Sequence, residues 1–214
     1  MTPHVPLWNE RTYRDFTFLN NQERLLYTWP QLTRESVVLD LGAYHGDWSA
    51  AILHSYHPRR LVLIEPVYNF ASIMKARFQD YPLVEVYQVA LGPRDCQADL
   101  LLSDDASRLV QSRDADEPHP RERINMRDAA KFLQQHHLDQ IDLCKINIEG
   151  SEYDLLDYLA SQNLLVQFTT LLVQFHDFIP EAASRYENIA FHLAETHTCL
   201  WRFPFVWEAW QRNA

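Results

Sequence analysis

Short apolar segments alternate with amphipathic segments along most of the chain. The apolar segments are typical of strands buried on both faces of a parallel sheet, and they span 37–41, 61–64, 84–91, 141–148 and 170–175. Segments with helical spacing of apolar residues lie between or after them, at 48–56, 68–78, 129–137, 152–159 and 182–195. Strands that alternate with helices pair in parallel through right-handed crossovers, so this pattern predicts a doubly wound α/β fold.

The two ends of the chain depart from this alternation. Residues 1–30 predict an N-terminal arm, irregular at first and then helical over 20–29, where Pro30 ends the helix because it lacks an N–H group. Residues 198–203 and 205–210 predict a closing antiparallel pair of strands. The length of 214 residues suits a single domain.

The segment from 93 to 120 is more polar than its surroundings. Leu100, Leu101 and Leu102 predict a short additional strand. Residues 103–120 carry acidic residues and prolines, and they predict a mobile loop that is long for a compact domain. Loops of this length often cover a functional site, but a tolerated surface insertion explains the pattern equally well.

Composition narrows the classes of function. The formal net charge of -10 argues against a nucleic-acid partner, because phosphate contacts need clustered Lys and Arg. The three cysteines, Cys96, Cys144 and Cys199, have no zinc-type spacing, and we expect neither a metal site nor a disulfide framework. No leader-like N-terminus and no long apolar run is present, so we expect a cytoplasmic protein without a membrane partner.

The four glycines indicate where a ligand binds. Each of them follows a predicted strand: they are Gly42, Gly46, Gly92 and Gly150. Ligands of open parallel sheets bind beyond the carboxyl ends of the strands. Glycine at such an end permits a positive φ and a close approach of ligand to backbone. The shared position of all four predicts a ligand site at this edge of the sheet.

The first glycine turn favours one kind of ligand. Residues 40–46 read Asp-x-Gly-x-x-x-Gly between a strand and a helix, which is not the spacing of dinucleotide-binding turns. The Asp40 carboxylate disfavours phosphates but suits a ligand with an ammonium and a sulfonium group, such as S-adenosylmethionine. A nicotinamide-dependent oxidoreductase is therefore disfavoured. The predicted cofactor-binding residues of this turn are Asp40, Gly42, Ala43, Tyr44 and Gly46.

The ends of the next two strands add further cofactor candidates. Glu65 ends the second strand and precedes Pro66, and a carboxylate there can accept the hydroxyl protons of a ribose. Val89 and Ala90, near the end of the third strand, are expected near the adenine ring.

Five segments together resemble one family. They read VVLDLGA, LIEP, VALG, KINIEGSE and QFH, and the fourth of them, residues 145–152, is the most specific. The chain resembles the FkbM-type S-adenosylmethionine-dependent methyltransferases. The resemblance implies a mostly parallel, seven-stranded Rossmann-like sheet and O-methylation of a hydroxyl on a sugar or secondary metabolite.

Two positions depart from the family pattern. Asn147 stands where the family usually has Asp, and Gln174 where it usually has Glu. Both changes remove a negative charge, so the sequence leaves a second hypothesis open: a cofactor-binding module with a methyltransferase fold that has lost catalysis. It also leaves the acceptor and the oligomeric state open, a homodimer being one option.

Methylation of a hydroxyl requires removal of its proton, so a base is expected near the methyl group. His176 is the best candidate by its ordinary pKa, although a strand-end histidine bonded to backbone is the simpler interpretation. Lys145, Asn147 and Glu149 alternate along one strand and share a face. We expect these four residues to form the catalytic site, with Lys145 alternatively neutralising Glu149 or Glu152.

Overall fold

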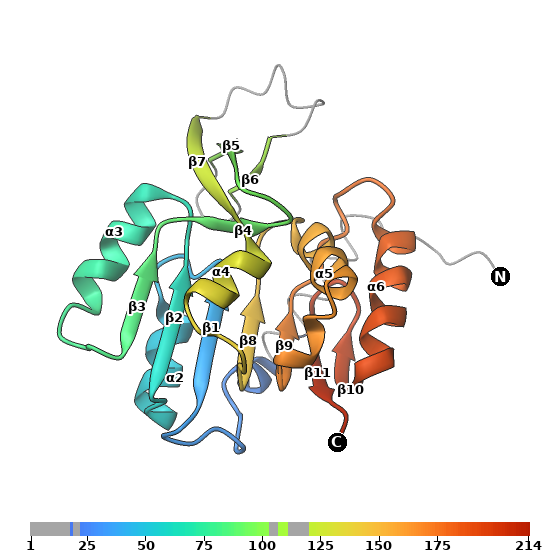
Figure 1. The fold of residues 1–214 in the computed structure, drawn as a ribbon, viewed down its shortest axis with the longest axis horizontal. Helices are drawn as coiled ribbons and strands as arrows, with labels where there is room; N and C mark the ends of the chain where they lie inside the picture. Colours follow the sequence, from blue (N-terminus) through green and yellow to red (C-terminus); the bar gives the residue numbers. More distant parts are fainter. Residues whose placement is uncertain (1–17, 19–21, 103–106, 111–119) are drawn as a thin grey trace.

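The computed structural model describes residues 18, 22–102, 107–110 and 120–214. Its centre is a seven-stranded sheet in the order β10-β11-β9-β8-β1-β2-β3 (Figure 1). The strands are β1 (Val37–Leu41), β2 (Arg60–Ile64), β3 (Val84–Tyr87), β8 (Leu143–Ile146), β9 (Thr170–Val173), β10 (His197–Phe203) and β11 (Trp207–Arg212). The first five are parallel, and β11 pairs antiparallel with both β9 and β10. The predicted seven-stranded, mostly parallel α/β fold is confirmed.

Helices cover both faces of this sheet. They are α2 (Asp47–Tyr56), α3 (Tyr68–Arg77), α4 (Ala129–Gln135), α5 (Glu152–Ser161) and α6 (Ala182–Thr196), with a short 3-10 helix η3 (Leu165–Gln167). Successive strand residues point to opposite faces. Leu39 of β1 therefore packs in the core under α4, α5 and α6, whereas Val38 packs in the core under α2 and α3. All five residues of β1 are buried, Asp40 among them, which explains why the other four are apolar.

The predicted N-terminal helix ends earlier than expected. Gln22 is helical and Glu23–Leu26 forms a 3-10 turn named η1, whereas residues 27–29 are not helical, and residues 19–21 lie outside the described part of the chain. A longer α-helix would bond the carbonyl of Leu26 to the N–H of residue 30, but that residue is Pro30. The indole N–H groups of Trp29 and Trp48 donate to this carbonyl instead. Proline thus ends the helix earlier than its apolar spacing predicts.

A second sheet lies over the carboxyl ends of the parallel strands (Figure 1). Its four strands, in the order β4-β7-β5-β6, are β4 (Ala90–Gly92), β7 (Arg121–Asp128), β5 (Cys96–Leu101) and β6 (Arg108–Leu109). The single strand predicted over 84–91 is wrong, because the chain leaves the central sheet after Tyr87 and enters the second sheet at Ala90. Of the short strand predicted over 100–102, Leu100 and Leu101 belong to the longer β5, and Leu102 follows its end.

The strand β7 was not predicted. Its residues alternate between the sheet's covered and solvent faces, and Ile124 is the buried apolar residue of the strand. A strand that is half exposed and rich in charges has no apolar run for a sequence pattern to detect. The predicted mobile loop over 103–120 contains β6, which pairs with β5. Residues 103–106 and 111–119 of that loop lie outside the described part of the chain.

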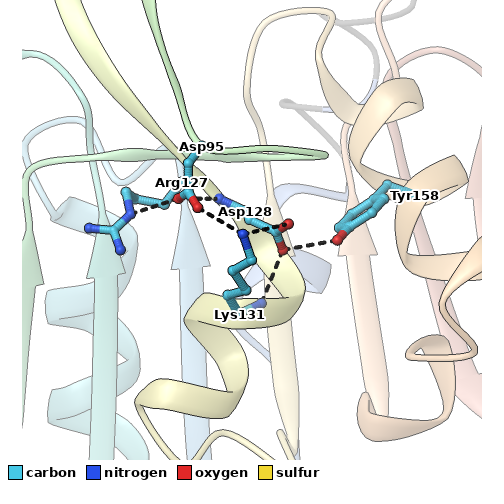
Figure 2. Close-up of polar contacts among 5 residues, drawn as sticks. All are labelled: Asp95, Arg127, Asp128, Lys131 and Tyr158. Carbon is cyan, nitrogen blue, oxygen red and sulfur yellow. Dashed lines mark hydrogen bonds and ion pairs between the residues drawn. The ribbon is translucent and has the colours of Figure 1, made fainter.

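A polar cluster joins the second sheet to the helices, as Figure 2 shows. Asp95 accepts hydrogen bonds from the Arg127 side chain, the backbone N–H of Asp128 and the Lys131 ammonium, at 3.0, 3.1 and 3.1 Å. Asp128 ends β7 and caps α4 by accepting from the N–H of Lys131, and the Tyr158 hydroxyl of α5 donates to it at 2.9 Å. These contacts fix where β7 leaves the second sheet.

Candidate functional site

A cavity of about 380 Å³ lies where the central and second sheets meet. It is within the range of small-molecule sites. Polar groups line it from the ends of the central strands: Glu65, Asn147, Glu149, Ser151, Gln174 and His176. Apolar side chains line it from the second sheet: Ala90, Leu91, Leu100, Leu109 and Met126. We call these two sets of residues the polar wall and the apolar wall. Further apolar lining on the side of the central sheet comes from Leu41, Ile64, Val67, Phe70 and Ile148.

The first glycine turn forms one edge of this cavity. Gly42 has a φ of 75°, and its N–H donates to the carbonyl of Ile64 at 3.0 Å. A Cβ at Gly42 would lie 1.8 Å from the carbonyl oxygen of Asn147, so any larger residue would push the turn off the end of β8. Tyr44 also has a positive φ, of 51°, and lines the cavity beside Gly42. Strand end and turn are thus packed backbone against backbone.

Glu65 holds a fixed position beside this turn. Its two carboxylate oxygens accept from the backbone N–H groups of Tyr44 and Val67, each at 3.0 Å. Glu65 is only 6% exposed. Burial raises the pKa of Glu65 to about 7, although the two backbone hydrogen bonds lower it. Each carboxylate oxygen keeps a lone pair for a further donor, which suits the paired hydroxyls of a ribose.

The remaining predicted cofactor residues divide into two groups. Pro66 and Ala90 line the cavity together with Gly42, Tyr44 and Glu65. Ala43, Gly46 and Val89 are not among its lining residues. Gly46 instead begins α2 with a φ of 80°, where a Cβ would lie 2.8 Å from the Phe78 ring.

Asp40 and Lys145 face each other beneath the glycine turn and do not line the cavity. Their strands are in register, and the Lys145 ammonium donates to Asp40 at 2.7 Å and to the carbonyl of Gly42 at 3.1 Å. The hydroxyl of Ser49 donates to the second oxygen of Asp40 at 2.7 Å. Lys145 therefore neutralises Asp40, whereas Glu149 and Glu152 were the partners considered from the sequence.

Glu149, Glu152 and His176 form a charged cluster at the polar wall. His176 is 2% exposed, with Nδ1 at 3.0 Å from Glu152 and Nε2 at 3.3 Å from Glu149. Glu152 also accepts the backbone N–H groups of Ile148 and Gly150, at 2.8 and 3.0 Å. Glu149 lies between them with a φ of 53°. Glu152 thus shapes the loop that carries Glu149.

The pKa of His176 differs from the ordinary histidine value on which its selection as a base relied. Burial lowers the pKa of His176, but the carboxylates of Glu152 and Glu149 outweigh this and raise it to about 10. A ring with this pKa is an imidazolium at neutral pH, and it cannot accept a proton in that state. The raised pKa therefore does not favour His176 as the base, and Glu149 is the carboxylate beside it that lines the cavity.

Asn147 and Gln174, the two positions that depart from the family pattern, lie together at the cavity. They follow the register pair Ile146 and Val173 at the ends of β8 and β9. Both line the polar wall, and the Asn147 side-chain oxygen is buried without a hydrogen-bond partner among the described residues. The structure therefore brings Asn147, Glu149 and His176 together and leaves Lys145 one layer below them.

Sequence reasoning missed two parts of the site. Of the apolar wall only Ala90 was predicted, because the other residues lie in a second sheet that the sequence did not predict. Glu152 was considered as a partner of Lys145, but not as an acceptor for the backbone N–H groups of Ile148 and Gly150. Within the described ranges, no group of three or more His, Cys, Asp or Glu side chains could hold a metal ion. No helix there is long and apolar enough to cross a membrane.

The chain was compared with known proteins. The model of the methyltransferase FkbM domain matches residues 40–200, which is more than half of the chain. A methyltransferase FkbM structure from Methylobacillus flagellatus KT is similar, with 14% identity, a TM-score of 0.51, and coverage of 84% of this chain and 43% of that one. The structure of a fibrillarin/Nop5p complex is similar with 10% identity, a TM-score of 0.51, and coverage of 88% and 78%.

These structural similarities show the fold alone, because the identities are low. None of the curated proteins matches the sequence. The chain spans less than half the length of the M. flagellatus protein. The matched range, residues 40–200, includes all the residues that line the cavity. The chain belongs to the FkbM family of S-adenosylmethionine-dependent methyltransferases.

Proposed function

We propose that this chain transfers a methyl group from S-adenosylmethionine to a hydroxyl oxygen of a small molecule. The observation that carries the proposal is that one cavity is lined both by Gly42, Tyr44 and Glu65, after β1 and β2, and by Glu149 and His176, after β8 and β9. We assign the first set to a cofactor side and the second to an acceptor side.

The cofactor side fits the nucleoside part of S-adenosylmethionine. Glu65 is held by two N–H groups and can accept the ribose hydroxyls, which is the role expected from its place at the end of β2. Pro66 and Ala90 offer an apolar surface next to it. The cofactor, when bound, supplies a methyl carbon made electrophilic by its sulfonium.

The acceptor side can take up the proton that a hydroxyl must lose. As the new O–C bond forms, the C–S bond breaks and the hydroxyl proton is released. The Glu149 carboxylate accepts this proton, and the imidazolium of His176 at 3.3 Å orients it. His176 acts here as a positioning residue, because both its ring nitrogens face carboxylates.

The acceptor is a small molecule in this proposal. The cavity volume of about 380 Å³ is of the size that encloses such ligands. Asn147 and Gln174 contribute neutral carboxamides, which can both donate to and accept from hydroxyl groups. Catalysis then depends mainly on alignment of the acceptor with the methyl group.

The variant Glu149→Gln tests the proposal. We expect the wild-type chain to bind S-adenosylmethionine by calorimetry and to form an O-methylated product, identified by mass spectrometry, from a panel of hydroxylated compounds. Glu149→Gln should lower turnover at least about 100-fold, in the range of general-base effects, and leave cofactor affinity within about threefold.

Glu187→Gln, on the exposed face of α6, is the matched control and should change neither quantity. Absence of binding of both the cofactor and its demethylated product to the wild type would refute the proposal. Cofactor binding with no turnover of any compound would favour the non-catalytic module, for which Asn147 and Gln174 provide the motive.

A further inference from the structure

A buried ion pair beneath the cofactor side has no part in the mechanism above. Asp40 lies in the middle of the sheet on β1, and Lys145 lies opposite it on β8. Their side chains are 0% and 9% exposed and 2.7 Å apart. Ser49 of α2 donates to the other Asp40 oxygen, so both oxygens already have a donor from the protein.

The same ammonium also bonds the glycine turn. Lys145 Nζ donates to the carbonyl of Gly42 at 3.1 Å, while the N–H groups of Gly42 and Ala43 donate to the carbonyl of Ile64 at 3.0 and 3.2 Å. The turn is therefore held from β8 on one side and from β2 on the other. Gly42 is the residue of the turn that touches both β8 and the cavity.

We propose that Asp40 and Lys145 are a positioning pair that sets the shape of the glycine turn, and through it cofactor affinity, without touching the cofactor. In this pair Lys145 holds the Gly42 carbonyl, and Asp40 compensates the buried charge of Lys145. The inference rests on the proposed binding of S-adenosylmethionine at this turn. It reassigns Asp40, whose sequence position suggested direct contact with the cofactor's ammonium.

The two interpretations predict different results when charge and hydrogen bond are removed separately. Removal of one partner of a buried pair leaves an uncompensated charge and is strongly destabilising, whereas removal of both is much better tolerated. Stability should therefore follow the charge balance of the pair. Affinity should follow the presence of the donor to Gly42, whatever stands at position 40.

Three variants of the full chain separate these effects: Asp40→Asn, Lys145→Met, and the double variant with both changes. Thermal unfolding gives the Tm, and calorimetry with S-adenosylmethionine and its demethylated product gives the Kd. Asp40→Asn should leave the Kd within about threefold, because its carboxamide oxygen can still accept from Lys145 and its NH2 group can donate to the Ser49 hydroxyl. Lys145→Met should lower the Tm most and raise the Kd at least about tenfold.

The double variant is the decisive one. It should recover most of the lost Tm but keep the raised Kd, since it removes the unpaired charge without replacing the donor. It also gives a folded protein for the measurement if Lys145→Met alone does not fold. A Kd raised about tenfold or more in Asp40→Asn, whatever its Tm, would overturn the inference in favour of direct contact. A double variant with wild-type Kd would overturn the role of Lys145.

The outcome is separable from that of the proposed function. If the wild-type chain binds neither cofactor form, the proposed function fails, and the coupling of affinity to the pair fails with it. The Tm values would then still show whether Asp40 and Lys145 compensate one another. If the wild type binds and only the variant pattern differs, the proposed function stands and the positioning pair does not.

Discussion

The central sheet and the second sheet enclose one cavity but differ in almost every property. The strands β1, β8 and β9 are buried throughout, with covered faces on both sides. The strand β7 alternates between exposed and covered residues along its length. The charged and amide groups of the cavity come from the ends of the central strands, beside apolar residues such as Leu41 and Ile64, whereas the strands of the second sheet contribute apolar side chains.

The two sheets therefore have different roles at the cavity: the central sheet supplies the polar groups, and the second sheet covers them with apolar side chains. Parallel strands bring their carboxyl ends to one edge, so polar groups far apart in the sequence meet there. Glu65 and Glu149 are such groups, and each has partners that fix it. Met126 and Leu100 on the second sheet exclude water from the same space. We infer that variants of the polar wall change affinity or turnover most, and variants of the apolar wall change them less.

The largest effect is expected at Glu65. Glu65→Ala should raise the Kd for S-adenosylmethionine at least about 100-fold, or about 2.8 kcal/mol, because it removes the acceptor for the ribose hydroxyls. Met126→Ala, on the apolar wall, should raise it less than about tenfold. Calorimetry on both variants measures the contrast. A larger loss in Met126→Ala than in Glu65→Ala would reverse the assignment of the two walls.

The central sheet could be predicted from sequence because its strands are covered on both faces and end at the polar wall. Strands covered on both faces give unbroken apolar runs, and a glycine or a carboxylate then marks the strand end. The second sheet gives no such run, since β7 contains mostly charged and polar residues. The break between β3 and β4 could not be predicted from the sequence either, because apolar residues continue across it at Tyr87 and Val89.

The prediction of the site residues had similar limits. Glu65 could be placed from its position at a strand end, but the partners of Asp40 and His176 required the register of distant strands. Asp40 and Lys145 are 105 residues apart in the chain, and His176 is 24 residues from Glu152. The carboxylates of Glu152 and Glu149 raise the pKa of His176, so its charge depends on these contacts. Composition and spacing carry no information on either pairing.

A smaller effect is expected from pH, again through the polar wall. With a pKa of about 7, Glu65 is about one-tenth ionised at pH 6 and about nine-tenths at pH 8. Ribose hydroxyls donate to the ionised form, so the Kd should be about tenfold lower at pH 8 than at pH 6. Glu65→Gln cannot titrate and is the control for ionisation of the ligand itself. Equal pH dependence in both proteins would contradict a carboxylate contact.

A rise in pH strengthens cofactor binding through Glu65 but lowers the stability of the unliganded protein. The pKa of Glu65 is raised on folding from 4.5 to about 7, so the folded chain binds more protons than the unfolded chain between these values. Its contribution to the free energy of unfolding is therefore lost as the pH rises from 4.5 to 7. Cofactor binding should recover part of this loss, and the Tm shift caused by ligand should grow over the same range.

The smallest effects are expected where the second sheet is joined to the helices (Figure 2). Asp128 is buried and caps α4, so Asp128→Ala should lower the free energy of unfolding by about 1 kcal/mol and the Tm by about 2–4 °C. Asp95 is solvent-exposed, and Asp95→Asn should give less than about half of that shift, because exposed ion pairs contribute little. Thermal unfolding measures both. In either variant the Kd should change less than in Glu65→Ala, since neither residue lines the cavity. A cofactor affinity that falls as far in Asp95→Asn as in Glu65→Ala would mean that the position of the second sheet, and not the polar wall, determines binding.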